Sequence, residues 1–212
     1  MGKKKKKEAK STERQAYGLT VLKASHRKIR RLKRKHEPEI HGNKLWTSSW
    51  LIMDFLEQQG LPKKPRVMEV GCGWGLAGIY CAKRHKASVV GIDADENVFP
   101  YLDLHAEVNG VKLKRRRGRF EGIRKKDLEG TDLVLGSDIC FWDDMVDPVY
   151  KLIRRAVRAG VQQVIVADPG RPPFEEVAQR CADKLGGITQ DWAIDDQVKA
   201  SGTLLIVGSL PH

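Results

Sequence analysis

Residues 67–75 decide the fold and read Val67-Met68-Glu69-Val70-Gly71-Cys72-Gly73-Trp74-Gly75, an apolar run that passes directly into three spaced glycines. A short apolar run of this kind predicts a buried strand, and the following residues, 76–84, are predicted to form a helix. Glycine permits tight turns and lets the backbone approach a ligand closely. Because ligands of open α/β sheets bind beyond the carboxyl ends of the strands, we expect the glycine loop to hold one.

The spacing of the glycines narrows the class of ligand. A dinucleotide fingerprint needs its third glycine where Leu76 stands, and a Walker loop needs Gly-Lys followed by Ser or Thr, which this loop lacks. Asp93 ends the next predicted strand, where a carboxylate can accept both hydrogen bonds of a ribose diol. Glu69 is a candidate for orienting an amino group of the ligand. The alternative interpretation is a plain strand–helix turn, with Asp93 serving only as a cap.

Predicted strands and helices alternate along the rest of the chain. Ser48 or Ser49 is expected to cap a helix that ends before Gly60, and residues 37–44 are expected to form a loop. The alternation predicts a Rossmann-like, doubly wound α/β fold with a mainly parallel seven-stranded sheet and a C-terminal antiparallel hairpin. The strands are expected at 66–70, 88–93, 112–120, 133–138, 164–168, 192–194 and 203–207, and the further helices at 96–108, 146–159 and 174–185.

The charge is concentrated at the N-terminus. The formal net charge is +12, but residues 1–36 hold 15 basic and 2 acidic residues, whereas the rest holds 24 and 25. We therefore expect a basic N-terminal extension over 1–36, disordered at 1–11 and helical over 12–36, before a domain at 37–212. The extension, and a second basic run at 112–119, are interpreted either as sites of contact with RNA, a ribosome or an acidic protein, or as solvated faces.

The cysteines and the apolar runs indicate the cellular environment of the protein. The four cysteines form no Cys-x-x-Cys pair, and no cluster with histidine predicts a metal site. No apolar run reaches the roughly 18 residues needed to span a membrane, and no apolar stretch follows the charged N-terminus as it would in a secretory signal. We expect a cytoplasmic protein, without a membrane partner, that is a monomer.

Residues 44–210 resemble the seven-β-strand class I methyltransferases, and more narrowly the family 16 protein lysine methyltransferases. Phe141 stands where that family usually has Tyr. The resemblance implies S-adenosylmethionine (SAM) as the cofactor and a protein lysine amine as the methyl acceptor. It is carried by Leu45-Trp46, by Val67 to Ile79, by Gly91-Ile92-Asp93, by Leu102 to Asn109 and by Asp132 to Phe141.

The resemblance also implies the site residues. Methyl transfer needs an amine held in line with the methyl group and a setting that favours its deprotonated form. Asp138 is the candidate for orienting the amine, while Trp46 and Trp142 are candidate channel walls, although each tryptophan could instead serve packing. The expected catalytic residues are Asp138, Phe141 and Trp142, and the expected cofactor-binding residues are Trp46, Glu69, Gly71, Gly73, Gly75, Asp93 and Asp138.

Two other classes of function stay open on the sequence. One is an RNA or small-molecule methyltransferase on the same fold, and the other is a weakly catalytic SAM-binding protein that binds nucleic acid. Enzymes that methylate amino groups of bases commonly carry Pro-Pro after the fourth strand, whereas Pro172-Pro173 follows the fifth strand here. This placement argues against methylation of the amino group of a base. Methylation of a protein lysine, which the resemblance implies, is the preferred hypothesis.

Overall fold

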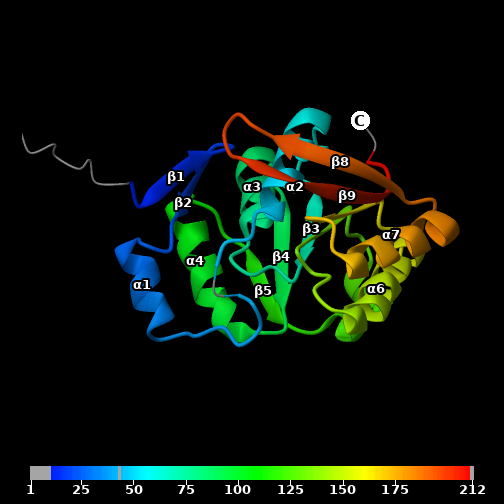
Figure 1. The fold of residues 1–212 in the computed structure, drawn as a ribbon, viewed down its shortest axis with the longest axis horizontal. Helices are drawn as coiled ribbons and strands as arrows, with labels where there is room; N and C mark the ends of the chain where they lie inside the picture. The colour runs from blue at the N-terminus through cyan, green and yellow to red at the C-terminus, as the bar shows by residue number, and fades with distance from the viewer. Residues whose placement is uncertain (1–10, 43, 211–212) are drawn as a thin grey trace, which may run out of the picture.

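The computed structural model describes residues 11–42 and 44–210 and is built on one twisted sheet of seven strands (Figure 1). The strand order is β5-β4-β3-β6-β7-β9-β8. Neighbours from β5 to β7 are parallel, while β9 is antiparallel to both β7 and β8. The expected Rossmann-like sheet with an antiparallel C-terminal hairpin is therefore confirmed. The strands are β3 (Arg66–Val70), β4 (Ser88–Asp93), β5 (Lys114–Arg117), β6 (Leu133–Ser137), β7 (Gln163–Asp168), β8 (Ile188–Ile194) and β9 (Ala200–Gly208).

Helices cover both faces of the sheet, so each face has its own core. One core is built on α2 (Ser48–Gln59) and α3 (Leu76–His85), with α4 (Phe99–Val108) beside them. The opposite core is built on α6 (Val146–Arg158) and α7 (Pro172–Leu185), with the one-turn α5 (Lys125–Leu128) at its margin. Strands β6 and β7 are almost wholly buried, as expected for parallel strands that are covered on both sides.

The N-terminal region corrects the prediction of one basic helix over 12–36. The structure has a hairpin of β1 (Glu13–Ala16) and β2 (Leu19–Leu22), followed by the short helix α1 (Arg27–Lys33). The chain turns at Tyr17 and Gly18, whose positive φ angles of 52° and 72° suit a tight two-residue hairpin turn. Both Tyr17 and Leu19 are buried in the α2–α3 core, so tertiary burial outweighs helical propensity here. The expected disorder at 1–11 lies, except for Ser11, outside the described residues.

The expected cap of α2 is corrected as well. Thr47, and not Ser48 or Ser49, occupies the cap position of α2, and its side chain makes no capping hydrogen bond. The backbone amide of Ser48 instead donates to the Asp138 carboxylate after β6. This contact ties the start of α2 to the sheet edge at which the carboxyl ends of β3, β4, β6 and β7 meet.

Candidate functional site

A cavity of about 500 Å³ lies at this sheet edge. Its size falls within the roughly 300–1,000 Å³ that is usual for ligand pockets. Seven of the predicted site residues line it, namely Trp46, Gly71, Gly73, Asp93, Asp138, Phe141 and Trp142. Lining residues that the sequence did not single out include Glu39, Ile40, His41, Phe120, Ile139 and Met145.

The glycine loop forms the floor of the cavity. Gly71 and Gly73 have φ angles of +59° and +49°, a region that favours glycine. A Cβ atom at Gly73 would meet no atom within 4 Å, so this backbone faces open space. Gly75 differs, because a Cβ atom there would lie 2.8 Å from Leu102. Gly75 therefore serves the close approach of α4 to the loop and is not part of the cavity lining.

Asp93 reaches the cavity from the end of β4. One of its carboxylate oxygens accepts a hydrogen bond from the backbone amide of Gly73 at 2.9 Å, and the other accepts one from Asp95 at 3.0 Å. Burial raises the pKa of this carboxyl, although the backbone amides oppose the shift. These bonds fix the carboxylate beside the glycine loop and leave further lone pairs for a ligand hydroxyl.

Glu69 lies elsewhere than its expected role requires. Alternate side chains of a strand point to opposite faces, and Glu69 points to the face that is covered by α3. Its carboxylate accepts a hydrogen bond from the backbone amide of Gly78 at 3.0 Å and is 2% exposed. Desolvation raises its pKa to about 8. Glu69 therefore supports the start of α3 from below and is not in the cavity lining.

Residues 37–42 and 44–46, which we call the strap, border the cavity. The Asp95 carboxylate accepts hydrogen bonds from the backbone amides of Glu39 and Ile40. The indole of Trp74, within the glycine loop, donates to the carbonyl of Gly42 at 2.9 Å. The sequence predicted a loop over 37–44. It did not predict that this loop is held to the cavity, because no local sequence pattern reveals contacts with residues so distant along the chain.

Aromatic side chains gather at the mouth of the cavity. Phe141 stacks on His41 with ring centroids 4.7 Å apart and meets the edge of Trp46 at 4.9 Å. Trp142 lies 5.0 Å from His41 and is 49% exposed. Trp46 is partly exposed and Trp142 is exposed, so both line the cavity and neither is a core residue. The ammonium of Lys44 lies 3.8 Å from the centroid of Trp46, so this wall already holds a lysine cation.

Asp138 stands beside the aromatic mouth in a strained conformation, with φ at +54° and 6% exposure. Its carboxylate accepts a hydrogen bond from Arg171 at 3.0 Å, and Arg171 also pairs with the fully buried Asp168 at 2.6 Å. The guanidinium lies 4.2 Å from the centroid of Phe141. No local sequence pattern shows that Arg171 holds Asp138.

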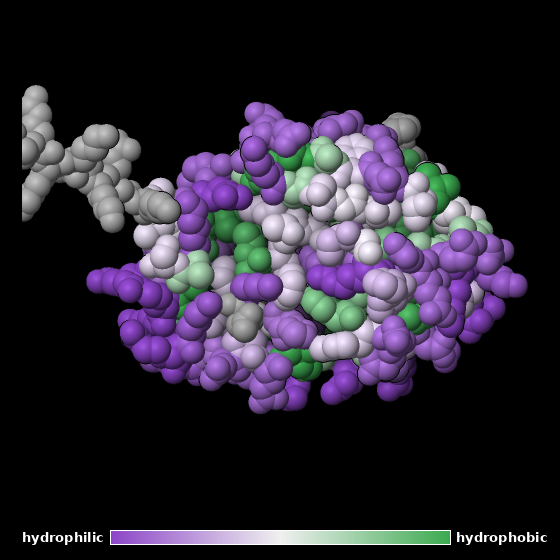
Figure 2. All heavy atoms as spheres, in the orientation of Figure 1, coloured by the Kyte–Doolittle hydropathy of each residue, from purple (hydrophilic) through white to green (hydrophobic). Residues whose placement is uncertain are grey.

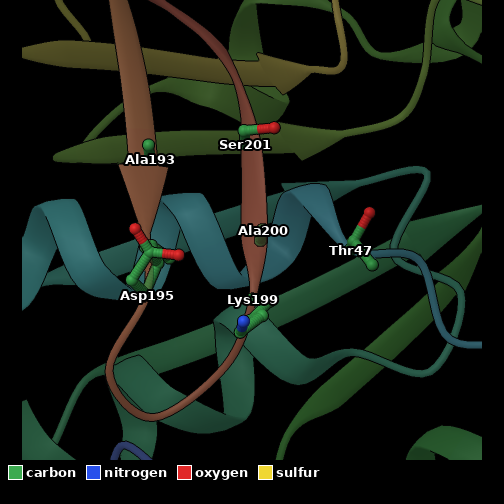
Figure 3. A pocket seen from close by; sticks show the side chains of 7 residues that line it. Thr47, Ala193, Asp195, Lys199, Ala200 and Ser201 are labelled. Atoms are coloured by element: carbon green, nitrogen blue, oxygen red, sulfur yellow. The ribbon is translucent and has the colours of Figure 1, made fainter.

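A second hollow, of about 400 Å³, adjoins the strap at Thr47 (Figure 3). Asp195 and Lys199 lie at the two ends of the connection from β8 to β9, and Ser201 lies on β9. The lining mixes charged, hydroxyl and apolar groups. Thr47 follows Trp46 of the aromatic mouth directly in the sequence.

Besides the cavity, the cysteines and the possible metal ligands among the described residues bear on the chemistry of the protein. All four cysteines are buried free thiols. Within 11–42 and 44–210, no group of three histidine, cysteine or acidic residues is placed to hold a metal ion. None of the helices in the same ranges is both long and apolar enough to cross a bilayer.

Comparisons with known proteins agree with this geometry. Residues 67–160 match the sequence model of a family described as "Methyltransferase domain". The chain is similar to the ubiquinone biosynthesis O-methyltransferase of Hahella chejuensis, with 34% identity over 84 residues, which are 40% of this chain and 35% of that protein. It is also similar to the electron transfer flavoprotein beta subunit lysine methyltransferase of Xenopus laevis, with 24% identity over 147 residues, 66% of this chain and 59% of that protein. The chain thus spans only part of the length of either relative.

A solved structure supports the fold. A methyltransferase from Pyrococcus furiosus superposes with a TM-score of 0.58 at 20% identity, covering 85% of this chain and 95% of that one. These comparisons together support a SAM-dependent methyltransferase, and its cofactor is SAM. The cavity fits this cofactor, because it offers open glycine backbone, a fixed carboxylate at Asp93 and aromatic faces, which attract a sulfonium.

Proposed function

We propose that this chain transfers a methyl group from SAM to the amine of a protein lysine, as the resemblance to the family 16 enzymes implies. The observation that carries the proposal is the mouth of the cavity, where aromatic faces stand next to the carboxylate of Asp138. Aromatic faces attract ammonium groups. Lys44 on Trp46 gives an example of that contact within the chain itself.

The cofactor roles in this proposal follow the cavity lining. Asp93 would accept hydrogen bonds from the ribose hydroxyls, and the backbone at Gly71 and Gly73 would approach the methionine part. SAM supplies the activated methyl group. The chain has to exclude water, position the amine in line and favour its neutral form.

Asp138 and Arg171 have opposite effects on an incoming amine. A carboxylate raises the pKa of a neighbouring amine, whereas a guanidinium lowers it. Because Asp138 is already paired with Arg171, its capacity to orient the amine by hydrogen bonding remains while its effect on the amine pKa is reduced. Burial within the aromatic mouth lowers the amine pKa further, and both effects favour the nucleophilic neutral form.

The relatives favour a lysine acceptor over a small molecule. The similarity to the O-methyltransferase covers 40% of this chain, whereas that to the lysine methyltransferase covers 66%. The longer alignment has to extend beyond the 94 residues of the shared family match, which are the cofactor-binding part. A small-molecule acceptor remains the second candidate because the identity over the shorter segment is higher.

Transfer of labelled methyl groups tests the proposal. The full chain is incubated with methyl-labelled SAM and a cell lysate, and the product is divided between protease and nuclease treatments. We expect label that only protease removes, and we expect much less label with the Asp138→Asn variant. Label removed only by nuclease would replace lysine with RNA as acceptor. Label in neither macromolecule would indicate a small molecule, or a weakly catalytic SAM-binding protein.

A further inference from the structure

Helix α1 and the residues just after it present an unneutralised cationic surface, which we call the α1 face. It consists of Arg27, Lys28, Arg30, Arg31, Lys33, Arg34 and Lys35. Within the described residues, only Lys28 of this set forms an ion pair, with Glu107 at 3.7 Å. Hydrophilic residues crowd the surface over α1 (Figure 2).

The second basic run, residues 112–119, differs from the α1 face in its ion pairs. Arg115, Arg116 and Arg117 on β5 pair with Asp103, Asp127 and Glu96, respectively. Internal acids thus neutralise much of that run. Within the described residues, three of the six cations of that run are paired, whereas six of the seven cations of the α1 face are not, so the α1 face is the denser cluster of unpaired positive charge.

The α1 face is held rigidly on the body. Ile29 is fully buried and packs, with the partly buried Leu32, in a cluster that includes Trp74 and Tyr101. The preceding hairpin is tied down too, because the side chain of Asn109 bonds to both backbone groups of Thr20. The cations are therefore presented in a fixed array, which lowers the entropy lost when they bind a partner.

We propose that the α1 face is a docking surface for the phosphate backbone of RNA. A protein partner needs buried apolar or aromatic anchors, and a membrane helix needs an exposed apolar face. The α1 face offers neither. The large apolar side chains that are exposed in the described chain are Ile40, Trp142, Val157 and Ile188, and none of them belongs to the α1 face. Phosphate contacts need only cations with access to solvent.

Several features favour RNA over duplex DNA. A helix that reads DNA protrudes into the major groove and carries base-reading side chains. Helix α1 has only seven residues and lies against α4, so it does not protrude from the body. It therefore suits surface contact with phosphates and not insertion into a groove.

The α1 face is also close to the mouth of the cavity. Glu39 of the cavity lining follows Lys33 by six positions, and six residue steps can span at most about 20 Å. An RNA bound to the α1 face would hold a protein of the same assembly within reach of the mouth. The proposed RNA binding does not depend on the proposed lysine methylation. Only the positioning of a protein substrate near the mouth depends on it.

Fluorescence anisotropy with a labelled RNA hairpin tests the proposal across a series of salt concentrations. The test variant carries Arg27→Gln, Arg30→Gln, Arg31→Gln and Arg34→Gln in the full chain, since Gln retains helix propensity. The matched control removes the same charge elsewhere, at four exposed lysines without an ion pair in the described chain: Lys63→Gln, Lys125→Gln, Lys126→Gln and Lys184→Gln.

We expect the α1 variant to lose at least about tenfold in RNA affinity at roughly 100 mM salt, and its log–log salt slope to fall by about 3, since each phosphate contact contributes about 0.7 to 0.9. The control should lose less than about threefold. Equal losses in the two variants would overturn the proposal, because binding would then follow net charge alone. Equally tight, α1-dependent binding of a duplex DNA of the same length would overturn the assignment to RNA. SAM binding by both variants, measured in parallel, confirms that each is folded.

Discussion

Alanine substitutions at Gly73 and Gly75 distinguish a glycine that faces the ligand from one that serves packing. Gly73 lines the cavity, and its added Cβ atom would meet no protein atom within 4 Å. The substitution therefore has no packing cost, and only the positive φ of 49° destabilises the fold, by about 1–2 kcal/mol. Because the new methyl group and the shifted backbone disturb the floor on which SAM is proposed to lie, we expect SAM affinity to fall at least about tenfold, or 1.4 kcal/mol.

Gly75→Ala is the matched control on the same loop. Its Cβ atom would lie 2.8 Å from Leu102, outside the cavity lining. Overpacking of this kind typically costs about 1–3 kcal/mol, in addition to the strain at a φ of 72°. We expect Gly75→Ala to lose more unfolding free energy than Gly73→Ala, while the folded protein binds SAM within about threefold of the original affinity.

Calorimetric titration with SAM and urea unfolding measure the two effects independently. The reasoning is refuted if Gly73→Ala binds SAM as tightly as the original chain. It is also refuted if Gly75→Ala, still folded, loses as much affinity as Gly73→Ala, because the loop would then respond as one unit.

Three further predictions concern the carboxylates of the region. Asp93→Asn should weaken SAM binding by about tenfold or more in calorimetry, since hydrogen bonds to a charged group contribute about 1.5–3 kcal/mol, and unchanged affinity would remove Asp93 from the site. Asp138→Asn should leave SAM affinity within about threefold and reduce methyl turnover by about tenfold or more, because a group that acts only on the acceptor affects the chemical step; equal turnover would show that Asp138 has no such role. Glu69, with a pKa of about 8 when folded against an ordinary 4.5, holds its proton in the folded state across that interval. Its contribution to stability is present at low pH and is lost as the pH rises toward 8. The free energy of unfolding, measured with urea from pH 5 to 8, should therefore decline with pH, and Glu69→Gln should flatten this decline. An equally steep decline in the variant would contradict this.

The central strands of the sheet were predictable because buried parallel strands read as apolar runs, whereas the exposed β8 was predicted only at 192–194 and begins at Ile188. Residues 66–70 and 88–93 match β3 and β4 in full, and the burial of both strands explains why. The hairpin at 13–22 was not predictable in the same way. Its first strand is exposed and polar, so the sequence carries no alternating pattern to distinguish it from a basic helix.

The site was predictable where a residue follows a strand and not where tertiary contacts place it. Asp93 and Asp138 were found because they end predicted strands at one sheet edge. Glu69 lies outside the cavity lining because the pleat of β3 turns its side chain to the face covered by α3, and a shift of one residue along a strand reverses the face. The pairing of Arg171 with Asp138 depends on contacts between segments 33 residues apart, which no local pattern reveals.

The most direct test of the central claim is chemical identification of the methylated residue. Protein labelled by the full chain with methyl-labelled SAM is hydrolysed to amino acids, which are separated beside methylated standards. The account predicts that the label co-migrates with Nε-methylated lysine and is lost with Asp138→Asn. Label on arginine, histidine or a carboxylate, or label unaffected by that substitution, would contradict it.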